Sequence, residues 1–297
     1  MVRDNEIKAT VSPFAIRPGE IKVFDGKDGY VSMSQIVQRI NLGHINELHF
    51  TILEIVNEFE FITSRQILQM LEKKGIDVGS QEKLNNKLEQ LVKSKILTRY
   101  YFDSQDGKGI YRIYCLEKMG KYLLDSRGIE CKWQPGNQVI IAYLNKVKAY
   151  ESYTPKPALK AKTLGKVFKA SGGGIKLTKG EKSIQFLFEV IRREDDWQNK
   201  LTDKIRMYKD FYENFVPGDC GYTALPQLII VCEDEKHIAE AFKHIVINKL
   251  EIDKINLYFT TDLKQNSDTL EDTLVSIKLD PDTQKYQMVT EKIKLLS

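Results

Sequence analysis

The sequence predicts a mixed α/β (α+β) protein with two folded domains. Three segments with apolar residues at helical spacing follow one another over 46–95, and two short alternating strands come after them. From residue 183 onward, strand and helix patterns alternate, as they do in a sheet flanked by helices. A chain of 297 residues is too long for one small hydrophobic core and fits two domains of ordinary size.

Composition excludes several classes of protein. Apolar residues make up 42% and charged residues 29%, which is typical of a globular protein. The net charge is only +4, so a nucleic-acid partner has to be argued from local charge. The four cysteines are scattered, and the four histidines form no metal-binding helix motif. The first residues lack a signal-peptide core, and no run approaches ~18 apolar residues. We therefore expect a cytoplasmic protein with reduced thiols and no membrane partner.

Residues 1–45 are predicted to form an irregular N-terminal arm. The stretch SPFAIRPGE is punctuated by proline and glycine, and IKVFDGKDGYVSM is predicted to be a hairpin that turns at Gly26 to Gly29. The arm is expected either to pack on the next domain or to mediate association. The predicted domains after it are 46–130 and 131–297.

The segment 46–130 has the element order of a winged helix-turn-helix. NELHFTILEIVNEF is the first helix, and FITSRQILQMLEKKG is the second, with Thr63 or Ser64 as its N-cap and Gly75 as its stop. GSQEKLNNKLEQLVKSKIL is the third helix, capped by Ser80. ILTRYYFD and IYRIYCL form a hairpin, and EKMGKYLLDSRG is a closing helix. In this fold the third helix enters the major groove of DNA.

Amide and ammonium groups on the third helix are predicted to contact base edges and phosphates. They belong to Gln81, Lys83, Asn85, Asn86 and Lys87. The hairpin adds Lys108 and Arg112, which could reach the neighbouring DNA backbone. Between positions 83 and 132 there are eleven basic and six acidic residues. This bias favours double-stranded DNA as a partner. The alternative is a protein-binding module whose charged face is only solvated.

The region 131–297 predicts a sheet flanked by helices. The first element is predicted to be a helix, GNQVIIAYLNKVKAY. The segment from Lys146 to Lys182 contains ten lysines and two glutamates. This segment is either a solvated hairpin or a site that binds a phosphate backbone. SIQFLFEVI, PQLIIVC and INLYFTT are strands, with the helices EDDWQNKLTDKIRMYKDFYENF and EKHIAEAFKHIVINKL between them. TLVSIKLDPDTQKYQMVT is a terminal hairpin, in which Pro281-Asp282 marks the turn.

A helix, a hairpin, an acidic strand and a long helix resemble the core of the PD-(D/E)xK fold, a restriction-endonuclease-like mixed sheet. More narrowly, a winged helix joined to FLFEVIRRE and KLTDKIRMYKDFY resembles the replication-relaxation family of Gram-positive plasmids and conjugative elements. In that family a strand ending in glutamate leads into a helix with a Lys-x-x-x-Tyr pattern. The resemblance assigns Glu189, Lys204 and Tyr208 to these positions. LPQLIIVCEDEKHI continues the likeness, which covers about residues 46 to 262.

Departures from the nuclease pattern argue against cleavage. A magnesium-dependent nuclease of this type needs two acidic groups and a lysine. The lysine would stand two residues beyond Glu189, where Ile191 is found, and Ala170 and Ser171 occupy the place of the expected Pro-Asp. We therefore expect no enzyme activity, no metal and no other cofactor.

Glu189 still requires an explanation, because an ionised carboxylate in an apolar strand is costly unless it is paired. We expect Glu189 to be either the remnant of a metal site or a structural carboxylate. Its expected partner is Lys200 or Lys204 on the following helix, or Arg192 or Arg193 just downstream. If the protein does cleave DNA, a rearranged site would consist of Glu189, Lys200 and Lys204.

The leading functional hypothesis is a DNA-binding protein of a mobile genetic element. The winged helix would recognise a specific site in plasmid replication or in processing of a conjugative transfer origin, a setting that the family resemblance implies. One alternative is a magnesium-dependent endonuclease with a rearranged site. Another is a scaffold whose winged helix docks a relaxase or replication protein. Symmetric sites are common for such domains, so we expect a homodimer.

Overall fold

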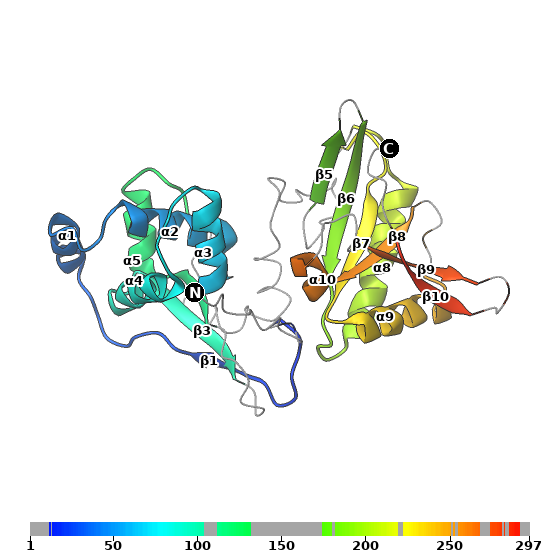
Figure 1. The fold of residues 1–297 in the computed structure, drawn as a ribbon, viewed down its shortest axis with the longest axis horizontal. Helices are drawn as coiled ribbons and strands as arrows, with labels where there is room; N and C mark the ends of the chain where they lie inside the picture. Colours follow the sequence, from blue (N-terminus) through cyan, green and yellow to red (C-terminus); the bar gives the residue numbers. More distant parts are fainter. Residues whose placement is uncertain are drawn as a thin grey trace, which may run out of the picture. The chain divides into compact units, whose positions relative to one another are not determined.

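The computed structural model describes Ser12 and residues 14–103, 112–131, 174–179, 182–218, 222–250, 252, 255–267, 274–280, 282 and 285–291. These residues form a mixed α/β protein with two sheets, which confirms the predicted fold class (Figure 1). The chain divides into two compact units. The N-terminal unit is Arg17–Tyr153, and the C-terminal unit combines Met1–Ile16 with Thr154–Ser297. No helix within the described ranges is long and apolar enough to cross a membrane.

The N-terminal unit contains the helices predicted over 46–130 and the hairpin predicted from ILTRYYFD and IYRIYCL. Its elements are β1 (Ile21–Phe24), α1 (Met33–Asn41), α2 (Glu47–Phe59), β2 (Ile62–Thr63), α3 (Ser64–Lys73), α4 (Gln81–Lys93), β3 (Leu97–Asp103), β4 (Ile113–Leu116) and α5 (Lys118–Asp125). The sheet order is β1-β3-β4-β2, and every pairing is antiparallel. From α2 to β4 this is the order of elements that a winged helix requires.

Local capping signals set the helix boundaries in this unit. Thr63 caps α3 through a reciprocal pair of hydrogen bonds with Gln66. Gly75 follows the end of α3 with a φ of +74°, a conformation that suits glycine. Both features agree with the predicted start and stop. The buried faces of α2, α3 and α4 share one hydrophobic core with β3 and β4.

The hairpin predicted for residues 21–33 is wrong. β1 instead pairs with β3, with Ile21 opposite Asp103, and the chain then forms α1. Ser32 and Gln35 form a capping box at the start of α1, and Ile36 anchors the helix in the core. The sequence around Gly26 to Gly29 signals a turn, but β3 offers β1 a pairing edge within the sheet. This part of the arm therefore packs on the next domain, one of the two predicted roles.

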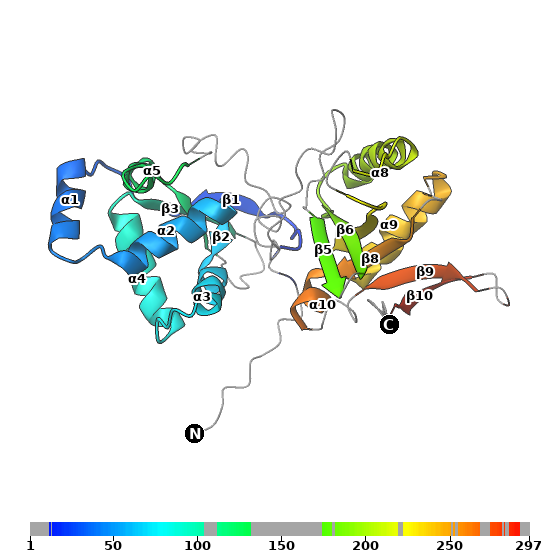
Figure 2. The same ribbon diagram turned by 90° about the horizontal axis from the view of Figure 1, so that it is seen from above.

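The C-terminal unit is built on a six-stranded sheet. Its elements are β5 (Gly174–Lys179), β6 (Lys182–Val190), α8 (Trp197–Glu213), β7 (Gln227–Cys232), α9 (Glu235–Ile247), β8 (Leu257–Thr261), α10 (Asp262–Ser267), β9 (Val275–Leu279) and β10 (Tyr286–Thr290). The sheet order is β10-β9-β8-β7-β6-β5, with β6, β7 and β8 parallel and the outer pairings antiparallel (Figure 1). Figure 2 shows β5 beside β6 at one edge of this sheet. Each parallel connection contains a helix, as such crossovers require.

The core of this unit lies between the sheet and the helices α8 and α9. Alternate residues of β7, including Leu228 and Ile230, pack against Leu201 and Ile205 of α8 and against the buried face of α9. The predicted turn at Pro281-Asp282 lies between β9 and β10, where the Asp282 N–H donates to Asp280 Oδ1 at 2.9 Å. The predicted helix at 136–150 and most of the lysine-rich stretch lie outside the described residues.

Candidate functional site

Helix α4 carries the polar side chains that are predicted to contact DNA. The Ser80 hydroxyl caps its first turn by accepting a hydrogen bond from the Lys83 N–H at 3.2 Å. Leu84, Leu88, Leu91 and Val92 bury the apolar face of α4, so the opposite face turns to solvent. That face presents, partly or fully exposed, Gln81, Lys83, Asn85, Asn86 and Lys87. The structure thus brings these five predicted residues together on one helix surface.

One side-chain hydrogen bond organises this surface. The Gln81 amide donates to Asn85 Oδ1 at 3.0 Å, which orients two of the amides one turn apart. Burial, and to a smaller extent the charge of Lys87, lower the pKa of His49 to about 4. His49 is therefore neutral at pH 7, and its Nδ1 accepts a hydrogen bond from the Asn46 N–H at 3.2 Å at the start of α2. The positive charge of the α4 face comes from its lysines.

The hairpin contribution differs from the prediction in one respect. Arg112, which is 49% exposed, has an intramolecular partner, because its Nε lies 2.8 Å from Asp25 Oδ2. The same oxygen lies 2.9 Å from Nε of Arg99. Asp25 follows β1 directly, so this pairing is a consequence of β1 joining β3. A half-exposed ion pair contributes only about 0–1 kcal/mol, so a phosphate group can compete for Arg112. Lys108 lies outside the described residues.

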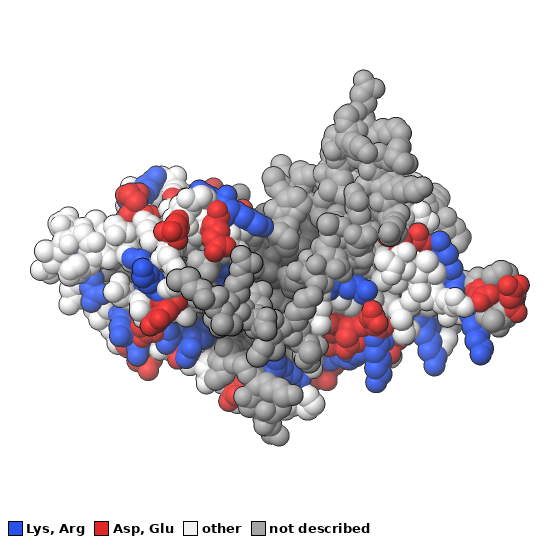
Figure 3. Space-filling model, in the orientation of Figure 1, with Lys and Arg blue, Asp and Glu red and all other residues white. Residues whose placement is uncertain are grey.

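Charge on the remaining surface is mixed. On the face drawn in Figure 3, basic and acidic side chains are interspersed over the described parts of both units. This agrees with the small net charge of +4. Over the described part of this face neither sign of charge dominates, so attraction for a polyanion there depends on local groups.

Glu189 is the buried carboxylate of β6. It lies opposite Ile230 of β7, on the sheet face that packs against α8, and its side chain is 3% exposed. The Tyr208 hydroxyl donates to Glu189 Oε2 at 2.8 Å, and Lys204 Nζ lies 3.3 Å from Glu189 Oε1. Lys204 and Tyr208 are one turn apart on α8, so both side chains reach the same strand. The structure brings together the three residues that the family resemblance selects.

The other basic residues expected as partners of Glu189 pair elsewhere. Lys200 forms an exposed ion pair with Glu194 at 3.2 Å. Arg192 forms a buried ion pair with Asp262 at 2.8 Å. Arg193 contacts three carboxylates, those of Glu233, Asp234 and Glu240. Of the four expected partners, Lys204 forms an ion pair with Glu189.

The carboxyl ends of the parallel strands hold a second polar cluster, which sequence reasoning missed. Its acidic residues follow the strands directly: Glu233 comes after β7, and Asp262 comes after β8. Hydrogen bonding to Arg193 is the largest cause that lowers the pKa of Asp234 to about 2. A usable sequence signal existed, because acidic residues stand at the ends of two apolar strands in QLIIVCED and LYFTTD.

Within the described ranges, no group of three or more His, Cys, Asp or Glu side chains could hold a metal ion. The donors around Glu189 include a hydroxyl and an ammonium group, which can stabilise a carboxylate without a metal ion. This arrangement can bury one negative charge. Among the residues that the structure describes, it does not present the paired carboxylates on which a magnesium-dependent nuclease relies.

Comparisons with known proteins add little to this geometry. No protein-family model matches the sequence, and no curated protein does either. The structure of the restriction endonuclease FokI is similar to the chain with 15% sequence identity and a TM-score of 0.29. This likeness covers 74% of the present chain and 45% of that chain, so it spans less than half of the FokI structure. A TM-score at this level carries no argument about fold or activity, and the predicted family stays a prediction.

Proposed function

We propose that the protein binds double-stranded DNA through the exposed face of α4, in a winged helix formed by α2, α3, α4, β3 and β4. The observation that carries this proposal is the division of α4 into two faces. Its leucines are buried in the core, whereas Lys83, Asn86 and Lys87 point to solvent from the helix that such domains insert into the major groove.

The chemistry of this face suits a duplex. Asparagine and glutamine amides can pair with the N6 and N7 groups of adenine, and lysines with guanine or with phosphates. A helix held by its apolar face and capped by Ser80 offers these groups without further ordering of the backbone. Low ordering cost favours binding, because less conformational entropy is lost in the complex.

We also propose that the C-terminal unit does not cleave the DNA. The Glu189 carboxylate is engaged by Tyr208 and Lys204, and Lys200 is engaged by Glu194. The proposed setting is replication or conjugative transfer of a mobile element, with a relaxase or replication protein as a further partner and a homodimer as the binding form. The support for this setting is the sequence pattern that joins Glu189 to the Lys204–Tyr208 pair.

The test is DNA binding by fluorescence anisotropy, with duplexes that tile the regions flanking the gene. The variant Lys83→Ala/Asn86→Ala/Lys87→Ala is expected to lose at least tenfold in affinity for the best duplex. The control Lys118→Ala/Lys121→Ala removes the same charge from α5 and is expected to bind within about twofold of the unmodified chain. Full affinity in the α4 variant would contradict the proposal and favour the scaffold alternative.

The endonuclease alternative keeps one supporting observation, the 3.3 Å approach of Lys204 to Glu189. Incubation of the protein with supercoiled plasmid and Mg²⁺ or Mn²⁺ tests it. We expect no cleavage above a metal-free control. Cleavage that Glu189→Gln abolishes, and that Lys200→Ala and Lys204→Ala reduce, would establish the rearranged site instead.

A further inference from the structure

The carboxyl ends of β6, β7 and β8 are closed by buried charged residues. Arg192 follows β6, Glu233 follows β7 and Asp262 follows β8, and each is at most 3% exposed. In open sheets with parallel strands, this edge is the usual place for a ligand. In the present chain the carboxylates of Glu233 and Asp262 hold a segment that is distant in sequence.

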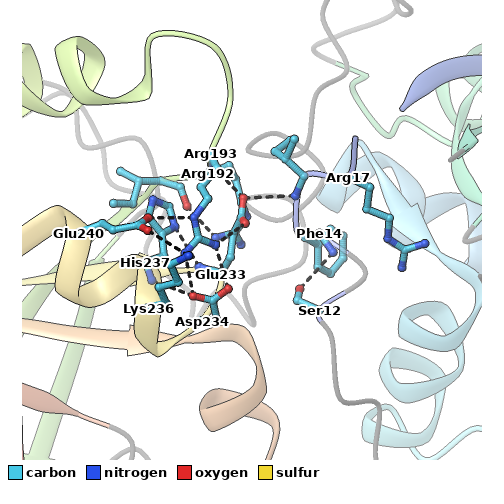
Figure 4. A network of polar contacts seen from close by, with 12 residues as sticks. Ser12, Phe14, Arg17, Arg192, Arg193, Glu233, Asp234, Lys236, His237 and Glu240 are labelled. Atoms are coloured by element: carbon cyan, nitrogen blue, oxygen red, sulfur yellow. Dashed lines mark hydrogen bonds and ion pairs between the residues drawn. The ribbon is translucent and has the colours of Figure 1, made fainter. Parts of the chain in front are cut away.

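That segment is residues 12–16, which belong to the same compact unit. The Ser12 hydroxyl donates a hydrogen bond to Asp262 Oδ2, and the Ile16 N–H donates to Glu233 Oε1 at 3.2 Å. Ser12, Phe14 and Ala15 are buried. Figure 4 shows Ser12 and Phe14 on one side of this network, with Glu233, Arg193 and Asp234 on the other.

The segment has a defined shape of its own. The Phe14 N–H donates to the Ser12 hydroxyl at 3.1 Å, and the Ala15 N–H donates to the Ser12 carbonyl oxygen at 3.2 Å. These bonds close a turn in which the serine side chain serves both the turn and the Asp262 carboxylate. The Arg193 N–H donates to the same oxygen of Glu233 at 2.8 Å, so that oxygen bridges the segment and the chain after β6.

We propose that this edge of the sheet is a peptide-binding site and that its ligand is the chain's own segment 12–16. Arg192 pairs with Asp262 and Arg193 pairs with Glu233. The Ser12 hydroxyl and the Ile16 N–H donate to Asp262 Oδ2 and Glu233 Oε1, so the site suits hydroxyl and amide donors together with an apolar side chain. A peptide of the type Ser-x-Phe-Ala-Ile supplies these groups. In sequence, residues 17–153 separate the segment from the rest of its unit, so it is bound as a tethered ligand.

Cleavage of the tether in the full chain tests the proposal. A protease site inserted between Pro18 and Gly19, which are exposed, allows the chain to be cut without removing the segment. After the cut, a fluorescent label on the fragment reports whether it stays bound during gel filtration. We expect the fragment to remain bound and to be displaced by an excess of the peptide ATVSPFAIRP. Ser12→Ala and Phe14→Ala are each expected to lower the affinity of the fragment for the rest of the chain roughly tenfold to a hundredfold, and so to reduce its retention.

Two controls keep the outcome decisive. Ser34→Ala changes an exposed serine outside the segment and should leave retention unchanged. The competing peptide with Ser12→Ala should displace the fragment far less well than the native peptide. Release of the unmodified fragment on cleavage would overturn the proposal. Equal retention of the unmodified, Ser12→Ala and Phe14→Ala fragments would overturn it as well.

Discussion

The guanidinium of Arg192 donates to the Asp262 carboxylate at 2.8 Å, and the two side chains are 0% and 1% exposed. The pKa of the Asp262 carboxyl is raised, because the effect of burial exceeds that of its contacts. The charge of Arg192 and the hydrogen bonds from Ser12 and Arg192 lower this pKa. The cost of removing this pair from water is therefore only partly offset by its contacts. Such a pair is sensitive to the loss of one partner and tolerant of the loss of both.

This relationship predicts the behaviour of three variants. Asp262→Leu leaves Arg192 buried without its carboxylate and is expected to lower the free energy of unfolding by about 3–5 kcal/mol. Arg192→Met is expected to do the same from the other side. The double variant should recover most of that loss, and urea denaturation measures all three. Additive losses in the double variant would show that the two residues act independently.

The second prediction compares two lysines one turn apart on α8. Lys204→Ala leaves Glu189, 3% exposed, without its ion pair and is expected to cost about 1–3 kcal/mol in urea denaturation. Lys200→Ala is the matched control, because its pair with Glu194 is exposed and should contribute less than about 1 kcal/mol. Equal effects of the two changes would contradict the structural role assigned to Lys204.

Lys200 and Lys204 illustrate which contacts could be predicted from the sequence alone and which could not. Helical spacing places Lys204 and Tyr208 on the side of α8 that carries the buried Leu201 and Ile205, and the family pattern selects the same pair. Spacing alone did not separate Lys204 from Lys200 as the partner of Glu189. That choice depends on how α8 lies across β6, which is a matter of tertiary packing.

Features set by neighbouring residues were predictable, whereas distant pairings were not. The caps at Thr63 and Ser80 depend on side chains within one turn, and both were found. The pairing of β1 with β3 joins Ile21 to Asp103, and a local turn signal led to the wrong hairpin. Ser12 and Asp262 are 250 positions apart, and no local pattern links a serine in a proline-containing stretch to a carboxylate after β8.

The third prediction concerns pH. Burial, followed by the charges of Arg193 and Arg192, lowers the pKa of His237 from 6.5 to about 3. Between these values the unfolded chain binds a proton that the folded chain does not, so stability falls as pH falls below 6.5. From pH 7 to pH 5 this contribution amounts to about 2 kcal/mol.

The variant His237→Gln isolates that contribution. It cannot take up the proton in the unfolded state, so the stability of the C-terminal unit should depend less on pH between 5 and 7. Its stability at pH 7 is expected to be lower, because Nδ1 of His237 accepts a hydrogen bond from the Glu233 N–H at 3.3 Å. Urea denaturation at several pH values measures the slope, and an unchanged slope would contradict the assignment.

The fourth prediction separates phosphate contacts from base contacts on α4. Each lysine that neutralises a phosphate releases counterions, so log K falls with log salt by about 0.9 for each contact. Lys83→Ala and Lys87→Ala are each expected to reduce the slope by about 1 and to weaken binding to all duplexes alike. Asn86→Ala is expected to leave the slope unchanged and to relax the preference for one base pair, because an amide reads a base edge without charge.

Anisotropy titrations at several salt concentrations, on the preferred duplex and on single base-pair variants, distinguish these effects. A salt slope that Lys83→Ala and Lys87→Ala leave unchanged would place the phosphates on another surface of the chain.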